Sequence, residues 1–297
     1  MISILPHEVS VGKLHHYLLG AIGPRPIAFA STIDEQGRPN LAPFSFFNIF
    51  SANPPIAIFS PARRGRDNTT KHTYENVKRV PEVVINVVNY SIVQQCSLAS
   101  TEYPEGVDEF QKSGLTAIPS DLIKPFRVLE SPVQLECRVN EVKELGHEGG
   151  AGNLVICEVL KIHINEDVLD QNGMIDPTKI DLVGRCGGNY YSRAFGDALF
   201  EVEKPLSTMG IGVDSIPKDI KFSKFLTGND LGILGNVESF PNETDVNEYK
   251  LTELSEIFIE WENNSEQLEK ALHLHAHQLL NEGKVQEAWK TLLSFNN

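Results

Sequence analysis

Cysteine is scarce in this chain of 297 residues, and its four copies lie far apart in the sequence. They form no CxxC pair, so the sequence indicates neither a zinc site nor a redox dithiol. We expect buried thiols in a reducing compartment and no metal site. These cysteines are Cys96, Cys137, Cys157 and Cys186.

Long apolar runs are also missing from the sequence. No stretch approaches the ~20 residues that a helix needs to span a bilayer. Residues 1–16 lack a basic segment followed by a long apolar segment and a small-residue cleavage site, so they do not form a signal peptide. We therefore expect a cytoplasmic protein without a membrane partner.

Positive charge is in deficit, because the formal net charge is −14 at pH 7. A nucleic-acid backbone would be repelled by such a chain, so we expect no nucleic-acid partner. The dense basic cluster of the sequence is formed by Arg63, Arg64, Arg66 and Lys71. One loop of this kind fits a small phosphate better than it fits a duplex.

Several catalytic motifs are absent too. No GxGxxG follows a predicted strand and opens a helix, so a Rossmann nicotinamide domain is not indicated. The absence of GxSxG, HExxH and Walker motifs excludes the commonest hydrolases and NTPases. The four histidines at 7, 15, 16 and 72 have no assigned role beyond the position of His72 in the basic loop.

The most informative segment that is present runs from Gly23 to Pro61. Its apolar runs predict three short strands, at residues 27–33, 41–50 and 56–60. Turn residues at 34–37 and the Pro54-Pro55 pair separate them. The hydroxyl side chains of this segment therefore lie near the ends or on the faces of successive strands, and they are Ser31, Thr32, Ser45 and Ser60.

This segment resembles the flavin reductase-like family of FMN-binding split barrels, whose members carry RPIA, ST, DG, an Asn before an apolar stretch, PFS and PP in the same order. Residues 63–73 look like the phosphate loop of the family, with His72 in place of the more usual acid. The resemblance continues through residues 82–88, 108–110 and 185–190. It covers the chain from Leu5 to about Phe200.

The resemblance implies an FMN site. Lys71 and Thr73 with Arg66 would bind the phosphate through charge-assisted bonds, although a solvated basic loop is the alternative interpretation. Hydroxyls can donate to or accept from the flavin, and aromatic side chains can either wall the ring or fill the core. The predicted cofactor-binding residues are Ser31, Thr32, Ser45, Phe46, Phe47, Ser60, Arg66, Lys71, His72 and Thr73. No general acid or base is assigned.

We expect a mainly β fold, a six-stranded antiparallel Greek-key split barrel with peripheral helices. It would occupy residues 1–203, and a helical C-terminal extension would occupy residues 204–297. Further strands are expected at 82–88, 133–145 and 153–164, helices at 73–79, 91–100, 218–226 and from 264 onward, and irregular connections at 101–132 and 228–247.

Three histidines alternate near the C-terminus, at 273, 275 and 277. Alternate positions on a helix point about 200° apart, so the three cannot share one metal ion. His273 and His277 do share a face, but a pair without a third ligand is more often a solvated face than a site.

The implied function is that of an FMN-dependent oxidoreductase, an NAD(P)H-dependent flavin reductase in which hydride passes to flavin N5. Electrons would then pass to free flavin, to a partner oxygenase or to another acceptor, and the chain would form a homodimer with FMN near the subunit interface. Two other interpretations stay open. One is a flavoredoxin-like FMN electron carrier that does not use nicotinamide, and the other is a B6-phosphate enzyme of related barrel architecture.

Overall fold

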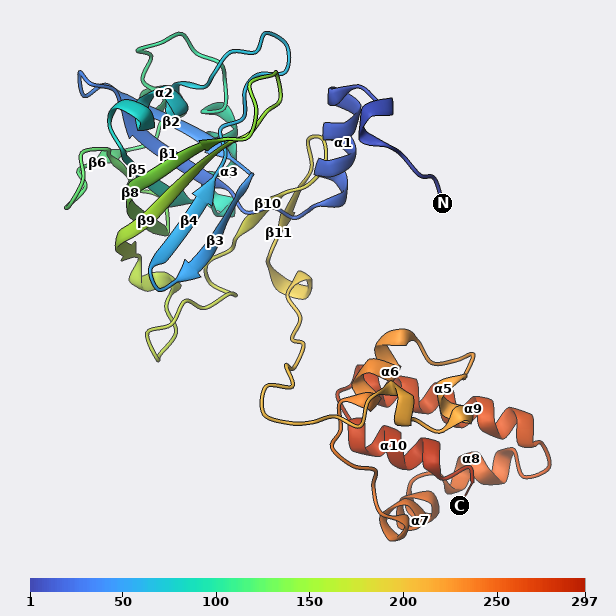
Figure 1. Cartoon of the computed structure of the whole chain (residues 1–297). Coiled ribbons are helices and arrows are strands. Elements are labelled where there is room, and N and C mark those ends of the chain that lie inside the picture. Colours follow the sequence, from blue (N-terminus) through green and yellow to red (C-terminus); the bar gives the residue numbers. More distant parts are fainter. Residues whose placement is uncertain (297) are drawn as a thin grey trace. The chain divides into compact units, whose positions relative to one another are not determined.

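The computed structural model describes residues 1–296 and divides the chain into two compact units, Met1–Phe200 and Glu201 onward. The first unit is built mainly of strands, and the second is built of helices (Figure 1). Each unit has its own hydrophobic core. The mainly β fold with a helical C-terminal extension is thus confirmed.

A single antiparallel sheet of seven strands forms the first unit, in the order β2-β1-β5-β8-β9-β4-β3. The strands are β1 Ala28–Ile33, β2 Pro39–Phe44, β3 Phe47–Ala52, β4 Pro55–Phe59, β5 Glu82–Val87, β8 Val133–Glu144 and β9 Asn153–Ile164. Two short ribbons accompany the sheet, one of β6 Ala117–Ile118 with β7 Arg127–Val128 and the other of β10 Val183–Arg185 with β11 Tyr191–Arg193.

The predicted number of six strands was one too few, because residues 41–50 do not form one strand. β2 ends at Phe44 and β3 begins at Phe47, and these two strands lie at opposite edges of the sheet. Only Ser45 and Phe46 join the two edges, so the sheet must curl until its edges approach each other. We call this corner, residues 45–46, the seam of the barrel.

The two faces of β1 contact different cores, although all six of its residues are buried. Ala28 and Ala30 belong to the cluster inside the barrel, which contains Phe59 and Val155. Phe29 belongs to a second cluster with the residues around α3. Since successive side chains of a strand point to opposite faces, Ser31 and Thr32 face different sides of the sheet.

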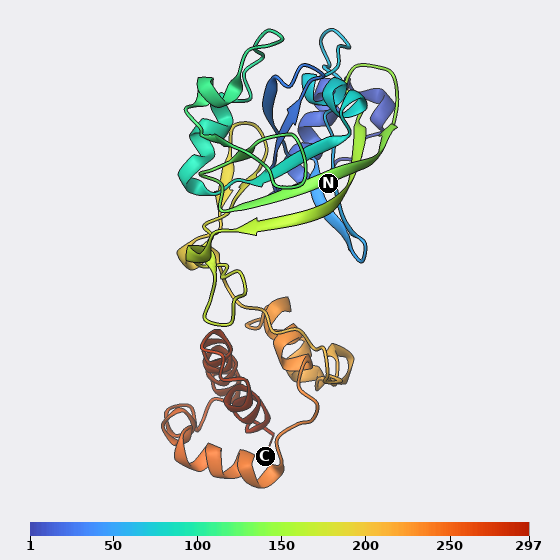
Figure 2. The same cartoon turned by 90° about the vertical axis from the view of Figure 1, so that its left-hand side faces the viewer.

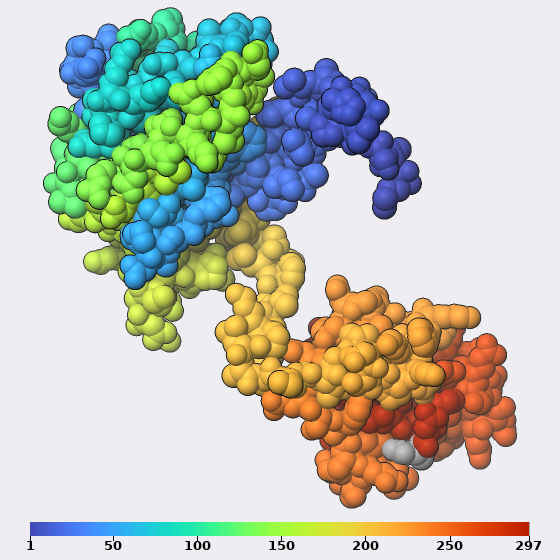
Figure 3. All heavy atoms as spheres, in the orientation of Figure 1, coloured from blue at the N-terminus to red at the C-terminus, as the bar shows by residue number. Residues whose placement is uncertain are grey.

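β8 and β9 are twelve residues long each and pair along their whole length. Their bounds agree with the predicted strands to within one residue. Figure 2 shows this hairpin curving along one side of the unit, and Figure 3 shows it beside the β3–β4 pair, with which β9 is hydrogen-bonded through β4. The hairpin therefore connects the two halves of the sheet.

The helices of the first unit are α1 Val11–Ala21, α2 His72–Arg79, α3 Val93–Leu98 and α4 Glu109–Ser113. α1 was not predicted, and α4 lies in the segment expected to be an irregular connection. Local signals for both are present: Ser10 accepts a bond from Lys13 N at the start of α1, and Asp108 caps α4. Gly114, with φ of 66°, ends α4.

The second unit contains α5 Lys218–Lys221, α6 Gly228–Gly235, α7 Glu243–Thr252, α8 Ser255–Glu260, α9 Ser265–Asn281 and α10 Val285–Leu293. The prediction of a turn-rich linker at 228–247 was wrong, because α6 and the first turn of α7 lie there. Thr227 and Asp230 form a reciprocal capping box that starts α6. Among the described residues, no helix combines the length and the apolar character that crossing a membrane requires.

His273 and His277 do lie on one face of α9, and they bind Ser223, which follows α5, and Asp230 in the first turn of α6. His273 Nδ1 lies 2.7 Å from Ser223 Oγ, and His277 Nδ1 lies 2.9 Å from Asp230 Oδ2. His273 is buried, and burial lowers its pKa. These two histidines therefore fasten one segment of the helical unit to α9.

Candidate cofactor site

The seam of the barrel brings together four of the predicted cofactor residues. Ser45 and Phe46 form the corner, Phe47 opens β3, and the N–H of Ser60 donates to the carbonyl oxygen of Phe46 at 2.9 Å. Phe46 is 41% exposed, whereas Ser60 is buried. The seam therefore presents an accessible aromatic ring beside hydroxyl groups at the ends of strands.

Arg25 lies under the seam and was not among the predicted site residues. Arg25 is 5% exposed, and its guanidinium donates to the carbonyl oxygens of Leu19, Ile22 and Cys186, with Leu19 at 2.7 Å. Burial lowers the pKa of this guanidinium, and Arg185 lowers it further. Leu19 and Ile22 belong to the end of α1, whose carbonyl groups carry partial negative charge.

The same guanidinium donates from Nε to Ser45 Oγ at 3.4 Å. Because the oxygen of Ser45 accepts from Arg25, its hydroxyl proton can be directed toward a ligand at the seam. The sequence signal for this residue was an arginine immediately before the buried strand β1, in the PRPIA segment. Arg25 thus positions a predicted flavin contact.

The basic loop after β4 encloses a carboxylate of the protein itself. Glu102 lies 3.0 Å from Arg64 Nε, 2.6 Å from Arg66 Nη2 and 3.5 Å from Lys71 Nζ. The hydrogen bond from Arg64 is the main cause that lowers the pKa of Glu102. Three of the four cations of the predicted phosphate loop therefore converge on one anionic group.

The backbone of this loop is held against the turn between β8 and β9. Arg63 N donates to Ala151 O at 2.8 Å, and Gly150 N donates to Arg63 O at 3.1 Å. A Cβ atom at Gly149 would lie 3.1 Å from the carbonyl oxygens of Arg64 and Gly65, so a glycine permits this close approach. The side chain of Arg63 is bonded to Asn68 within the loop.

Thr32 and Thr73 meet in a buried polar cluster that joins β1, β2 and α2. Asn40 Nδ2 donates to Thr73 Oγ1 at 3.0 Å, and Asn76 Nδ2 donates to Thr32 Oγ1 at 3.1 Å. Both threonines are fully buried. Their hydroxyl groups stabilise the packing of α2 on the barrel and lie beneath the surface of the basic loop.

His72 lines a cavity of about 110 Å³ together with Arg38, Asn40 and Arg79. Sites for drug-sized ligands occupy roughly 300–1,000 Å³, so this cavity is too small for a flavin ring. The side chain of Lys71, its neighbour in the sequence, contacts Glu102 instead. These two consecutive residues therefore lie in different surroundings, His72 at the small cavity and Lys71 beside Glu102.

Two buried polar atoms lack a hydrogen-bond partner among residues 1–296, Ser31 Oγ and Asn153 Oδ1. Ser31 faces the cluster around Phe29 and lies apart from Thr32, as the alternation of the strand requires. Asn153 was not predicted, yet its N–H donates to Ser60 Oγ at 3.0 Å and its Nδ2 donates to Pro61 O. Asn153 therefore lies between the seam and the start of the basic loop.

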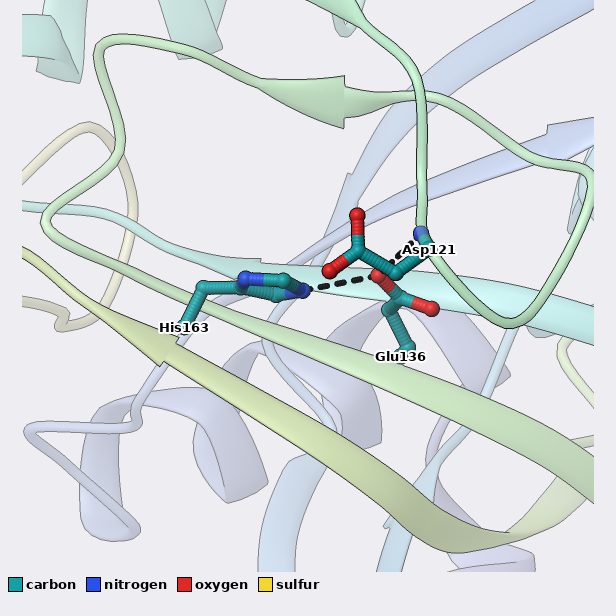
Figure 4. A group of neighbouring side chains, drawn as sticks. All are labelled: Asp121, Glu136 and His163. Atoms are coloured by element: carbon teal, nitrogen blue, oxygen red, sulfur yellow. Dashed lines mark hydrogen bonds and ion pairs between the residues drawn. The ribbon is translucent and has the colours of Figure 1, made fainter.

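Asp121, Glu136 and His163 form a separate group of potential metal ligands (Figure 4). Glu136 is fully buried and accepts from the N–H groups of Asp121 at 2.8 Å and Leu122 at 2.7 Å, and it lies 2.7 Å from His163 Nε2. Lys161 and Arg127 also lie near these carboxylates. The negative charges are thus already paired, and the group fastens the loop at 121–122 to the sheet.

Removing the charge of Glu136 is expected to destabilise the first unit by about 2–3 kcal/mol at pH 7, because the group accepts several hydrogen bonds in a buried place. Burial raises the pKa of Glu136, but the N–H groups of Asp121 and Leu122 and the His163 ring lower it more, and the net shift is downward. A lowered folded-state pKa stabilises the fold above the unfolded pKa near 4.5. This stability is lost as the pH falls through the folded-state value.

Urea unfolding of Glu136→Gln at neutral and acidic pH measures this effect, which should shrink as the pH falls. Glu158→Gln serves as the control, because Glu158 is paired with an exposed Arg138 at 2.7 Å. A loss for Glu136→Gln no larger than that for Glu158→Gln would contradict the assigned role.

Comparison with known proteins identifies the first unit. Residues 21–191 match the model of the flavin reductase like domain. An uncharacterized protein of Aquifex aeolicus is 35% identical over 195 residues, which are 66% of this chain and 97% of that protein.

Solved structures agree with this match. Nitrilotriacetate monooxygenase component B from Bacillus cereus is 29% identical, with a TM-score of 0.63 over 69% of this chain and 98% of that one. A putative flavin reductase with a split barrel domain from Shewanella frigidimarina is 26% identical, with a TM-score of 0.57 over 67% of this chain and 95% of that one. The chain belongs to the flavin reductase-like family, as its sequence predicts.

Proposed function

We propose that the protein is an FMN-dependent oxidoreductase that accepts hydride from NADH or NADPH. Membership of the flavin reductase-like family supports a flavin-related oxidoreductase. The observation that carries the choice of FMN is the convergence of Arg64, Arg66 and Lys71 on one carboxylate. A group of donors that accommodates a carboxylate is also suited to a phosphate.

The residues at the seam fit the other end of the cofactor. Ser45 can donate a hydrogen bond, Phe46 offers an exposed aromatic surface, and Asn153 Oδ1 is a buried acceptor without a partner among the described residues. In this proposal Arg66 and Lys71 bind the phosphate, while Ser45 and Phe46 contact the ring. Bound FMN supplies the atom that accepts hydride, and these side chains bind and orient it.

We further propose that the nicotinamide docks transiently at the exposed side of the seam, since the sequence contains no Rossmann fingerprint. The same open position would then admit the electron acceptor, either free flavin or the oxygenase component of a two-part system. The name of the Bacillus cereus protein, a monooxygenase component, supports the second kind of acceptor.

A homodimer through the barrel is part of the proposal. Ile49 lies opposite the buried Ala57 in the β3–β4 ladder and thus on the inner face of the sheet, yet it is 52% exposed. Phe50 and Ile162 are 65% and 54% exposed. Large apolar side chains exposed on a sheet can be covered by a partner, and a second copy is the partner that we propose. Light scattering at micromolar concentration tests it, and a monomer would refute it.

An anaerobic titration tests the function directly. The FMN-loaded protein is mixed with NADH or NADPH, and we expect the flavin absorption to bleach with a rate that saturates with nicotinamide concentration. Lys71→Ala should weaken FMN binding about tenfold, because a charge-assisted bond contributes about 1.5–3 kcal/mol. It should leave the free energy of unfolding of the flavin-free protein nearly unchanged, because the side chain of Lys71 is partly exposed and its ion pair with Glu102 is long, at 3.5 Å.

The outcomes separate the remaining alternatives. If dithionite bleaches the flavin at once while neither nicotinamide does so over minutes, the protein is an electron carrier and the reductase proposal fails. If the protein binds pyridoxal phosphate and does not bind FMN, the flavin proposal itself fails.

A further inference from the structure

Glu102 occupies the centre of the basic loop. It lies between α3 and α4, well outside the loop in sequence, yet both of its carboxylate oxygens contact the cations there. Oε1 lies 3.0 Å from Arg64 Nε and 3.5 Å from Lys71 Nζ, and Oε2 lies 2.6 Å from Arg66 Nη2. The carboxylate thus presents its two oxygens to these donors as a phosphate group would.

The charge around Glu102 is not balanced by the loop. Three cations surround this single carboxylate, and within residues 1–296 the other acid paired with them is Asp67, which lies 2.9 Å from Arg66 Nε. Three positive charges thus meet two negative ones. The cluster retains an attraction for further negative charge even while Glu102 is bound.

We propose that Glu102 is an internal competitor for the phosphate site and weakens the binding of ligands that carry a phosphate. The inference rests on the proposed function, since it takes FMN as the ligand. A phosphate group carries a charge of about −1.5 to −2 near neutral pH and has three acceptor oxygens. The carboxylate carries one charge and two oxygens, so a phosphate displaces it from the same cations, and a ligand without a phosphate leaves it in place.

The ion pairs of Glu102 are exposed, so little free energy is needed to replace the carboxylate with a phosphate. The side chain of Glu102 is 39% exposed and that of Arg66 is 70% exposed. Ion pairs at such exposed positions contribute little to the stability of a protein. A tightly buried pair would resist displacement, whereas a stronger anion can displace this exposed one.

Removing the charge of Glu102 tests the proposal through the ratio of two affinities. In Glu102→Gln, we expect the FMN dissociation constant of the flavin-free protein to fall by about fivefold, since the competing carboxylate is lost. The riboflavin dissociation constant should stay unchanged. A purely structural role for Glu102 would shift both constants together, so the ratio of riboflavin to FMN affinity distinguishes the two roles.

Glu158→Gln is the matched control, because it also removes a carboxylate from an exposed arginine pair, with Arg138 at 2.7 Å, and should leave both constants unchanged. Glu102→Ala is the second variant and should change the ratio in the same direction. An FMN affinity that is equal or weaker in the two Glu102 variants, or a failure of both to fold, would overturn the inference. If the unaltered protein binds FMN no more tightly than riboflavin, the phosphate assignment in the proposed function fails first.

Discussion

Replacing Arg25 by alanine is expected to lower the free energy of unfolding of the first unit by about 3–5 kcal/mol, which is among the largest effects for a single substitution. Arg25 is 5% exposed, and its guanidinium joins the end of α1, the turn after β10 and the seam. Its removal would leave the carbonyl oxygens of Leu19 and Cys186 without this donor. A smaller side chain would also leave a cavity under Ser45.

Chemical denaturation monitored by circular dichroism measures this loss. Arg25→Lys keeps the charge but lacks the planar fork of donors, so we expect it to recover only part of the stability. Arg138→Ala is the control, because Arg138 is 58% exposed and pairs with Glu158 on the surface. Equal stabilities of Arg25→Ala and Arg138→Ala would show that the buried guanidinium does not hold the three segments together.

The flavin affinity of Arg25→Lys is informative as well. Because Nε of Arg25 donates to Ser45 Oγ, the lysine variant should weaken FMN and riboflavin binding alike. This behaviour differs from that of Glu102→Gln, which should change the affinity for FMN alone. The two variants therefore separate the contacts of the ring from those of the phosphate.

Most strands could be predicted because their signals are local. β8 and β9 alternate apolar and polar residues on either side of a glycine-rich turn, and β1 and β5 are continuous β-branched and apolar runs. The order of the motifs within residues 23–61 led to the family. Such signals lie within a few consecutive residues, so they can be recognised without knowledge of the tertiary structure.

The closure of the barrel could not be predicted in this way. Residues 41–50 form a largely apolar run, and only the pairing of β2 with β1 and of β3 with β4 shows that the run changes partners at Ser45. This change places the predicted residues Ser45, Phe46 and Ser60 together. The alternation of side chains along β1 places Ser31 and Thr32 on opposite faces, which a list of neighbouring hydroxyl residues does not reveal.

Arg25 and Glu102 escaped prediction because their partners are distant in sequence. Cys186, an acceptor for Arg25, is 161 positions away, and Arg66 is 36 positions from Glu102. No periodicity or spacing connects residues so far apart. The helices that were missed are a different case, because Ser10 and Thr227 are ordinary N-cap signals that could have indicated α1 and α6.

A substitution in the core of the second unit should destabilise that unit without affecting the cofactor site. Trp289 is fully buried, its Nε1 donates to Leu234 O at 3.1 Å, and its ring packs edge-on against Phe240 at 4.9 Å. A substitution of this kind costs about 3–5 kcal/mol through lost burial and the cavity that remains. The stability of a domain of this size is about 5–15 kcal/mol, so Trp289→Ala should leave the helical unit marginally stable.

FMN binding by Trp289→Ala should stay unchanged, since every predicted cofactor residue belongs to the first unit and each unit has its own core. Scanning calorimetry should show a transition of the helical unit lowered by more than about 10 °C, given a shift of roughly 4–8 °C for each kcal/mol in domains of 60–100 residues. Trp261→Ala, at a partly exposed position after α8, is the control and should shift it by much less. A parallel loss of FMN affinity in Trp289→Ala would show that the helical unit takes part in the cofactor site, because nothing else in the first unit is altered by the substitution.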